Sequence, residues 1–527
     1  MITGKNLIGK KWSAKGVKTF HTFNPRLNKE NQFQFFEATD AEIDEAVALA
    51  SEAFKVYRCV SGKDKADFLN AIADEILALD DVLIDVYCLE SGLSEQRAHI
   101  ERTRTIYQLR SFADLVQEGS WVDASIDVGL PDRYPKAKPD LRKINIPLGP
   151  VVVFGASNFP LAYSTAGGDT AAALAAGCPV IVKSHPMHAG TGELVASAVA
   201  KAAENTNMPA GVFSNLNSSG ISLGKQLVLH PKVKAVGFTG SLAGGRALFN
   251  LAAQRPEPIP VFAEMGSVNP VVLFPDAIGR QADHWAKTYA QSITLDAGQF
   301  CTNPGLILGL KSTALKEFAN YLAKEIANVK PSCMLHPNIL GAFEDKKQSV
   351  VSQNGTTIVM EQTDGVRDNF ARQAVVTVEG ATFLDNTRLH QEVFGPFSLV
   401  VQCESFGELE RIINNLEGQL TGTIIGTADE VSQNQNIVEA LKNRVGRLIF
   451  NGVPTGVEVC PSMMHGGPYP ASTDSRFTAV GINAIKRWVR PVSYQNFEDD
   501  LLPPELKNSN PLGIFRMIDG EWTQSTV

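Results

Sequence analysis

A lone cysteine is the residue with the most chemistry to offer in this chain. Cys301 closes the run Gly298-Gln299-Phe300-Cys301, and no second thiol stands near it at the spacing of a metal or redox pair. As a thiolate it can attack a carbonyl carbon and later leave again. A single cysteine is more often a small buried apolar residue, so Cys301 alone indicates little.

Three other polar residues complete the machinery that such a nucleophile needs. Asn158, before Phe159-Pro160, offers an amide N–H that, with the backbone N–H of Cys301, could stabilise an oxyanion. Glu264, at the end of an expected strand, could activate a water molecule if burial raises its pKa. Glu392 adds a downstream carboxylate. Singly, Asn158 reads as a turn residue and each Glu as a surface residue; together they favour catalysis.

Size and composition exclude several classes of protein. The 527 residues are too many for one simple core, so two or three domains are expected. A net charge of −8 without a run of five Lys or Arg residues argues against a nucleic-acid partner. The seven cysteines form no CxxC pair, so we expect neither a metal site nor disulfides. With no signal-peptide core and no apolar run long enough for a bilayer, we expect a cytoplasmic protein without a membrane partner.

The order of the expected elements indicates an α/β protein. Helical spacing is found over 41–56, 64–89 and 94–118. Short apolar strands then alternate with helices, as in a doubly wound parallel sheet; the strands are 151–154, 179–182, 211–214, 234–238 and 261–264, and the helices are 165–176 and 189–205. A second α/β region, from about 270 to 450, contains strands at 271–274, 306–308, 397–401 and 423–425.

A turn in the first region could hold a phosphate. Gly237 lies near the end of the strand 234–238, and Gly240 and Ser241 lie between this strand and the following helix. The helix N-terminus offers free N–H groups to a pyrophosphate, and Ser241 adds a hydroxyl. Doubly wound sheets bind nucleotides at the carboxyl ends of their strands, which is where this turn lies. The turn is not a GxGxxG fingerprint.

Five short motifs give the chain a resemblance, over nearly its whole length, to the aldehyde dehydrogenase superfamily. They are Asn158-Phe159-Pro160, Phe238-Thr239-Gly240-Ser241, Glu264-Met265-Gly266, Gly298-Gln299-Phe300-Cys301 and Glu392-Val393-Phe394-Gly395-Pro396. The resemblance implies an NAD(P)-dependent enzyme in which Cys301 forms a hemithioacetal and then a thioester, Asn158 binds the oxyanion and Glu264 activates the hydrolytic water. The chain departs from the family in Gly266-Ser267-Val268-Asn269-Pro270, where most relatives have a second Gly and a Lys or Ser.

The resemblance also implies how the cofactor is held. Glu392 and Phe394 correspond to the nicotinamide-ribose site, and Lys183, Ser184 and His185 correspond to the adenosine side. Pro186 stands where relatives that prefer NAD often carry a Glu, which repels a 2′-phosphate. Lys183 and His185 would attract that phosphate, so we expect NADP to be preferred and NAD to be possible.

The family pattern further implies the division of the chain. Residues 1–122 and 148–262 would form the cofactor-binding domain, 263–450 the catalytic domain, and 123–147 with 488–500 a small β arm for oligomerisation. Residues 451–487 would return to the cofactor domain and form the substrate loop, and 501–527 would be a C-terminal tail. A homodimer or homotetramer is expected.

Within the superfamily, the chain is similar to the α-ketoglutaric semialdehyde (2,5-dioxopentanoate) dehydrogenases. The resemblance rests on runs such as Pro454-Thr455-Gly456-Val457-Glu458 and His465-Gly466-Gly467-Pro468. Arg104, Phe159 and Phe300 are the candidate substrate contacts. A long-chain fatty aldehyde or another semialdehyde is the alternative substrate. Acyl transfer to coenzyme A and a noncatalytic scaffold are the competing functions, and Glu264 and Cys301, respectively, argue against them.

Overall fold

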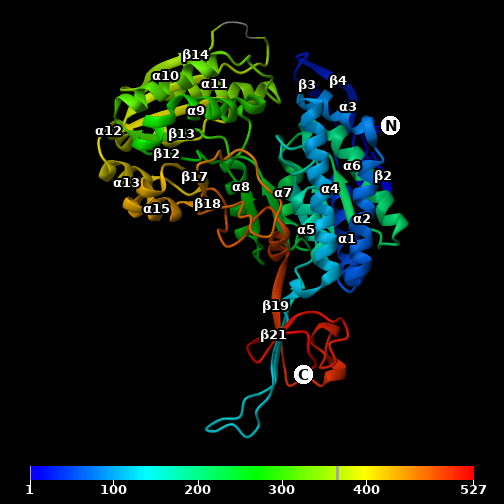
Figure 1. Cartoon of the computed structure of the whole chain (residues 1–527). Helices are drawn as coiled ribbons and strands as arrows, with labels where there is room; N and C mark the ends of the chain where they lie inside the picture. Colours follow the sequence, from blue (N-terminus) through cyan, green and yellow to red (C-terminus); the bar gives the residue numbers. More distant parts are fainter. Residues whose placement is uncertain (1, 364–366) are drawn as a thin grey trace.

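The structure is a computed structural model, and it describes residues 2–363 and 367–527. Two lobes lie side by side above a narrow stalk (Figure 1). One lobe contains α1 to α8, the other contains α9 to α15, and the stalk carries the C-terminal end of the chain. Among the described residues, no helix has both the length and the apolar character required to cross a bilayer.

The first lobe is built on a seven-stranded sheet in the order β11-β10-β7-β8-β9-β1-β2. The five strands from β11 to β9 run parallel to one another, whereas β1 and β2 add an antiparallel edge. The strands are β1 (Asn6–Ile8), β2 (Lys11–Ser13), β7 (Val151–Phe154), β8 (Val180–Lys183), β9 (Phe213–Leu216), β10 (Ala235–Thr239) and β11 (Val261–Glu264). The expected doubly wound sheet is therefore present.

Helices cover both faces of this sheet, which is why its strands are apolar on both sides. Val151 and Val153 pack in the core beneath α2 to α6, and Val152 packs in the core beneath α1, α7 and α8. The helices are α1 (Asp40–Tyr57), α2 (Gly62–Leu77), α3 (Asp80–Ser91), α4 (Glu95–Glu118), α5 (Gly168–Ala176), α6 (Ala189–Asn205), α7 (Ser222–Leu229) and α8 (Leu242–Ala253).

One expected helix is in fact two. The single helix expected over 64–89 ends at Leu77 as α2, and α3 begins at Asp80. Asp80 has a positive φ of 44°, a left-handed conformation that interrupts an α-helix. Apolar periodicity continues through the break because both helices pack on the same core, and the periodicity alone therefore hides it.

The second lobe has its own seven-stranded sheet, in the order β14-β15-β16-β13-β12-β17-β18. Its cores lie on both faces, with Val272 and Leu308 in one and Val271 and Ile307 in the other. The strands are β12 (Val271–Leu273), β13 (Leu306–Leu310), β14 (Thr357–Glu361), β15 (Ala374–Glu379), β16 (Phe397–Cys403), β17 (Gln419–Ile425) and β18 (Val445–Phe450). The helices are α9 (Pro275–Thr294), α10 (Thr313–Ala327), α11 (Pro337–Val351), α12 (Gly380–Asp385), α13 (Phe406–Asn415), α14 (Ala428–Gln433) and α15 (Gln435–Lys442).

The stalk is a five-stranded sheet in the order β19-β6-β5-β20-β21. Its strands are β5 (Ser125–Asp127), β6 (Leu141–Pro147), β19 (Val489–Gln495), β20 (Arg516–Ile518) and β21 (Glu521–Thr523). Residues 501–527, expected as a C-terminal tail, join this sheet: β20 pairs with β5, and Leu502 and Leu506 pack in the stalk core. A further hairpin, β3 (Thr19–Asn24) with β4 (Lys29–Phe36), follows the first edge strands.

Candidate active site

The loop that carries Cys301 begins directly after α9 and has an unusual backbone. Asp296 and Ala297 have positive φ values of 45° and 58°, and Gly298 follows at 65°. A Cβ on Gly298 would lie 2.4 Å from the carbonyl carbon of Gly395. Only glycine permits this approach, which brings the segment after Glu392 against the Cys301 loop.

Asn269 holds the same loop in place through hydrogen bonds to two of its carbonyl oxygens. Its Nδ2 donates to the carbonyl oxygens of Cys301, at 2.8 Å, and Asn303, at 2.9 Å. Its Oδ1 accepts from the hydroxyls of Ser267 and Thr421 at 2.9 and 3.0 Å. Sequence reasoning treated Asn269 only as part of a departure from the family pattern and missed this positioning role. Its position between a base motif and a strand was the only available signal.

Glu264 and His465 stand next to the thiol. Glu264 ends β11 and is 4% exposed, and His465 is 1% exposed. His465 Nε2 lies 3.0 Å from Glu264 Oε1 and 3.6 Å from Cys301 Sγ. Among the described residues, neither oxygen of Glu264 accepts a hydrogen bond of good geometry. The sequence placed His465 in a family-like run but assigned it no role.

The electrostatics keep the resting thiol protonated. Burial, followed by the nearby Glu264 carboxylate, raises the pKa of Cys301 well above its usual range, and the positive charge of Arg104 acts in the opposite direction. A thiolate therefore needs a proton acceptor or a further positive charge close to the sulfur. Glu264 and His465 are the adjacent groups that can take the proton.

The two expected oxyanion donors converge on the same loop. Asn158 Nδ2 donates one hydrogen to the carbonyl oxygen of Gln299 at 3.1 Å, which leaves its second hydrogen available. In the part of the chain that the structure describes, the backbone N–H of Cys301 donates to no protein acceptor. This arrangement can hold an oxygen next to the sulfur from two sides.

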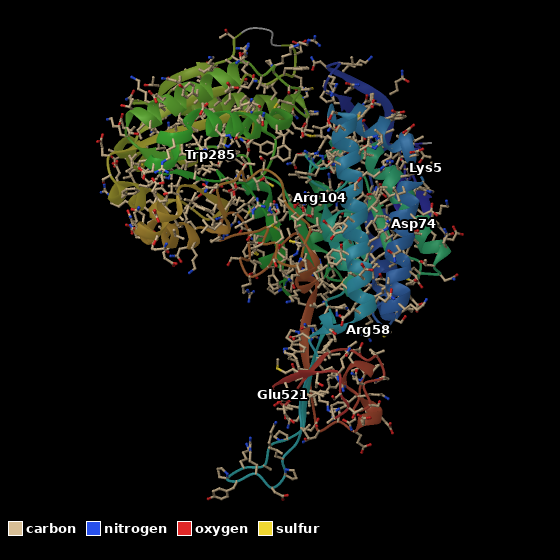
Figure 2. The ribbon with its side chains drawn as sticks, in the orientation of Figure 1. Lys5, Arg58, Asp74, Arg104, Trp285 and Glu521 are labelled. Atoms are coloured by element: carbon tan, nitrogen blue, oxygen red, sulfur yellow. The ribbon has the colours of Figure 1, made fainter. Side chains whose placement is uncertain are left out.

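A cavity of about 420 Å³ opens above the sulfur. Cys301 shares its lining with the three expected substrate contacts Arg104, Phe159 and Phe300, and with the loop residues Thr455 to Val457. Arg104 projects from α4 toward the second lobe (Figure 2). Its Nη2 donates to the hydroxyl of Tyr163 at 3.0 Å, and its buried Nε has no partner among the described residues. No carboxylate among those residues forms an ion pair with it.

A second arginine in this cavity, Arg97, is fully committed to the protein. Its Nη1 donates to Asp296 Oδ2 at 2.8 Å, and its Nε lies 3.5 Å from Glu101 Oε2. Its guanidinium lies over the rings of Phe159 and Phe300, at 4.4 and 4.8 Å from their centroids. Arg97 thus connects the Asn158 segment to the Cys301 loop, and Arg104 is the cation that remains for a ligand.

The end of β10 and the start of α8 form the turn at which an anion was expected to bind. Ser241 is the N-cap of α8, and its Oγ accepts from the backbone N–H of Gly244 at 3.2 Å. The hydroxyl hydrogen of Ser241 stays available to a ligand. A Cβ at Gly240 would lie 2.7 Å from the Phe238 ring, so the turn can close only with glycine. Gly237 lies within β10, where a Cβ would lie 2.6 Å from an oxygen of Asp169.

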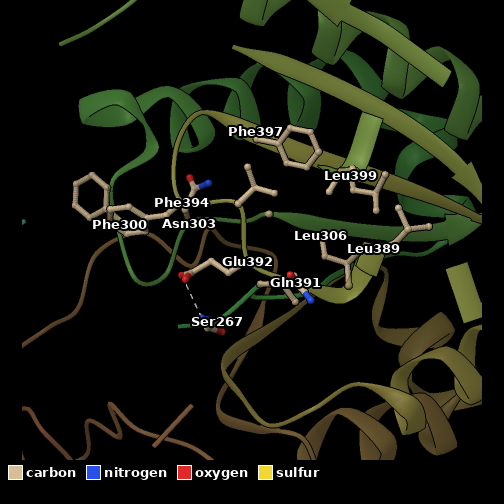
Figure 3. A pocket seen from close by; sticks show the side chains of 14 residues that line it. Ser267, Phe300, Asn303, Leu306, Leu389, Gln391, Glu392, Phe394, Phe397 and Leu399 are labelled. Carbon is tan, nitrogen blue, oxygen red and sulfur yellow. Dashed lines mark hydrogen bonds between the residues drawn. The ribbon is translucent and has the colours of Figure 1, made fainter. Parts of the chain in front are cut away.

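Glu392 lies close to the base motif. Its Oε1 accepts from the backbone N–H of Ser267 at 3.3 Å (Figure 3). A Cβ on Gly266 would lie 2.4 Å from Glu392 Oε2, so this glycine makes room for the carboxylate. Burial raises the pKa of Glu392 to about 7. Phe394 lines the same small pocket (Figure 3).

The three adenosine-side residues differ in what they can offer. Lys183 ends β8, and no hydrogen bond or ion pair engages its ammonium within 2–363 and 367–527. Burial lowers its pKa to about 8. His185 Nδ1 accepts from the backbone N–H of Met187 at 3.3 Å, and burial lowers its pKa well below the usual range, so the ring is a neutral donor rather than a cation. Ser184 Oγ is buried beside Gly192 of α6 and is not turned toward the strand ends.

These features define a class of protein. A buried carboxylate lies next to a cysteine that lines a cavity, and a nearby sheet strand leads into a helix start. This arrangement is typical of an enzyme that forms a covalent bond to a carbonyl carbon. Comparison with known proteins gives the same result. The model of the aldehyde dehydrogenase family matches residues 12–485.

The similar proteins cover almost the whole chain. It is 46% identical over 521 residues to α-ketoglutaric semialdehyde dehydrogenase 2 of Azospirillum brasilense, with 99% of each chain covered. It is 42% identical to α-ketoglutaric semialdehyde dehydrogenase of Acinetobacter baylyi, also over 99% of both chains. The betaine aldehyde dehydrogenase of Staphylococcus aureus, solved with NAD⁺, superposes with a TM-score of 0.80 at 19% identity, covering 94% of this chain and 95% of that one.

The chain belongs to the aldehyde dehydrogenase family, as the motifs indicated. It is an NAD(P)-dependent aldehyde oxidoreductase, and the expected α/β fold is confirmed. The residues present fit such a cofactor: Lys183 is unengaged, Ser241 caps a helix start, and Glu392 occupies space that a side chain at position 266 would fill.

Proposed function

We propose that this enzyme oxidises α-ketoglutaric semialdehyde to 2-oxoglutarate, with Cys301 as the nucleophile. One observation carries the proposal: Arg104, a cation with no carboxylate partner among the described residues, lines the cavity in which Cys301 lies. A half-buried cation of this kind favours an anionic ligand. The names of the two similar proteins that cover 99% of the chain support the same substrate.

The aldehyde would bind with its carboxylate toward Arg104 and its carbonyl carbon over the sulfur. Tyr163 holds the guanidinium in place through its hydroxyl. Phe159 and Phe300 pack edge to face, with ring centroids 5.8 Å apart, and supply an apolar wall on which the Arg97 guanidinium lies. The positive charge of Arg104 thereby distinguishes the carboxylate end of the substrate from its aldehyde end.

The reaction would begin with transfer of the Cys301 proton to Glu264 or His465. Sulfur attack then forms a hemithioacetal, whose oxygen accepts hydrogen bonds from Asn158 Nδ2 and the Cys301 N–H. Bound NAD(P)⁺ supplies the acceptor for the hydride that leaves this carbon. The resulting thioester is hydrolysed by a water that Glu264 deprotonates, and Cys301 departs as thiolate.

For the cofactor, we propose that NADP is accepted and preferred. Pro186 brings no negative charge to the adenosine side, and Lys183 is unengaged and positively charged below about pH 8. His185 would contribute a neutral hydrogen-bond donor, and Glu392 would accept from the ribose hydroxyls near the sulfur. The proposed role of Ser184 rests on its backbone only, because its hydroxyl faces α6.

We also propose that the chain forms a homodimer or homotetramer through the stalk sheet. Strand β19 pairs with β6 over the whole of 489–495 and leaves its other edge unpaired within the described part of the chain. Light scattering after size-exclusion chromatography measures the assembly directly.

The test is a substrate panel on the parent enzyme and two matched variants. The substrates are 2,5-dioxopentanoate, succinic semialdehyde, glutaraldehyde and a long-chain aldehyde, each with NAD and NADP. Arg104→Met removes the free cation, and Arg110→Met is the control on the same helix, where the arginine forms an exposed pair with Asp74. Loss of a hydrogen bond to a charged group, about 1.5–3 kcal/mol, predicts a fall of roughly 10–150-fold in kcat/KM for 2,5-dioxopentanoate with Arg104→Met.

The neutral substrates discriminate between the alternatives. Glutaraldehyde and the long-chain aldehyde should lose little with Arg104→Met, because neither carries a carboxylate. Equal losses for all four substrates would contradict the proposed substrate orientation, and a long-chain aldehyde turned over best by the parent enzyme would favour the alternative substrate. Release of a free acid, rather than a thioester to added coenzyme A, separates hydrolysis from acyl transfer.

A further inference from the structure

Three side chains from distant parts of the sequence meet at the sulfur as a set of metal donors. Cys301 Sγ, His465 Nε2 and one carboxylate oxygen of Glu264 all lie within 4.8 Å of one another. Glu264 is only 4% exposed, and neither of its buried carboxylate oxygens has a hydrogen-bond partner among the described residues. A buried carboxylate without hydrogen bonds is poorly stabilised and favours a cation.

The distances suit a zinc ion. Zinc binds cysteine sulfur at about 2.3 Å and histidine nitrogen at about 2.0–2.1 Å, so tetrahedral ligands of these two types are about 3.5 Å apart. The observed separation of Cys301 Sγ and His465 Nε2 is 3.6 Å. The 3.0 Å separation of His465 Nε2 and Glu264 Oε1 is somewhat shorter and requires only a small adjustment of the carboxylate.

Charge and donor type select the same ion. A thiolate and a carboxylate together neutralise a divalent cation, which suits a buried place, and the imidazole adds a neutral ligand. Sulfur and nitrogen donors favour Zn²⁺ over Mg²⁺ or Ca²⁺, which require oxygen. The cavity beside Cys301 leaves the fourth ligand position to water.

We propose that Cys301, His465 and Glu264 form a reversible zinc-binding site that switches the enzyme off. On binding, Cys301 releases its proton to solvent, and Zn–S, Zn–N and Zn–O bonds form. The sulfur lone pair and the proposed base are then both engaged, so neither attack on the aldehyde nor hydrolysis can proceed. A chelator removes the ion and restores the free residues.

The test measures metal binding on the full-length reduced protein, independently of activity. Zn²⁺ titration by calorimetry gives the stoichiometry and Kd, and Co²⁺ as a probe reports sulfur ligation through a thiolate-to-cobalt charge-transfer band. We expect one Zn²⁺ per chain and a Kd raised at least tenfold in both His465→Asn and Glu264→Gln. Cys59→Ser, which removes an exposed thiol just after the end of α1, should leave Kd unchanged.

Two results would overturn the proposal. If Zn²⁺ binds His465→Asn and Glu264→Gln as tightly as it binds the parent, the metal is held by the thiol alone. If Co²⁺ gives no charge-transfer band in the parent, sulfur is not a ligand. Circular dichroism checks the fold of each variant, and Glu264→Gln decides the matter if His465→Asn is unfolded. Inhibition that is reversed by EDTA, and protection of Cys301 from alkylation by Zn²⁺, complete the expected pattern.

Discussion

Replacing Arg97 by methionine should uncouple the two loops of the active site. The substitution removes the 2.8 Å bond to Asp296, the 3.5 Å contact with Glu101 and the cation that lies over two aromatic rings. Breaking a buried ion pair costs about 3–5 kcal/mol, and each cation–π contact contributes about 0.5–2 kcal/mol. Burial already raises the pKa of Asp296 and Arg97 acts against this, so uptake of a proton by Asp296 will relieve part of the cost. We expect a net loss of roughly 3–5 kcal/mol in unfolding free energy.

Catalysis should fall as well, because Glu101 also holds the Asn158 segment. Its Oε1 accepts from the backbone N–H groups of Leu161 and Ala162 at 2.7 and 2.9 Å. Misplacing an oxyanion donor costs up to about 10²–10³ in rate, so we expect kcat to fall roughly 10–100-fold with a smaller change in KM. Arg97→Lys should recover part of the loss, since it keeps the charge but lacks the planar fork.

Urea denaturation and steady-state kinetics on the same preparations give both quantities. Arg110→Met is the matched control, because its pair with Asp74 is 48% and 68% exposed and should contribute at most about 1 kcal/mol. If Arg97→Met lowers stability but leaves kcat within twofold of the parent, Arg97 supports only the fold and the argument is refuted.

Three further predictions concern the proposed base and the cofactor residues. Glu264→Gln should give one stoichiometric burst of reduced cofactor and then a steady-state rate lowered roughly 10²–10⁴-fold, and rapid further turnover would exclude Glu264 as the base. Burial lowers the pKa of Lys183 to about 8, so its positive charge is lost above that pH. The NADP-to-NAD ratio of kcat/KM should therefore fall between about pH 7 and pH 9. In Lys183→Met the same ratio should not change with pH. Burial raises the pKa of Glu392 to about 7, and its carboxylate accepts hydrogen bonds best when ionised. The kcat/KM for the cofactor should therefore rise as the pH increases through about 7. The same rise in Glu392→Gln would exclude Glu392 as the group that causes it.

Residue type and local order were sufficient to identify the family and nominate Cys301, Glu264 and Asn158. The helix over 189–205 was predicted with its observed bounds, and most strand positions agreed within about two residues, because apolar periodicity and turn residues act over short stretches of chain. The break at Asp80 was missed, since a left-handed residue leaves the apolar pattern intact.

Only the tertiary structure could reveal the contacts between residues distant in sequence. His465, in the loop that follows β18, contacts Cys301 and Glu264, and Asn269 donates a hydrogen bond to the Cys301 carbonyl oxygen. β20, close to the C-terminus, pairs with β5, whose position in the chain is nearly 400 residues earlier. Neither residue spacing nor local propensity encodes such pairings, because they arise from how elements pack around shared cores. The sequence therefore determined which groups can react, and packing decided which of them meet and which charges remain uncompensated.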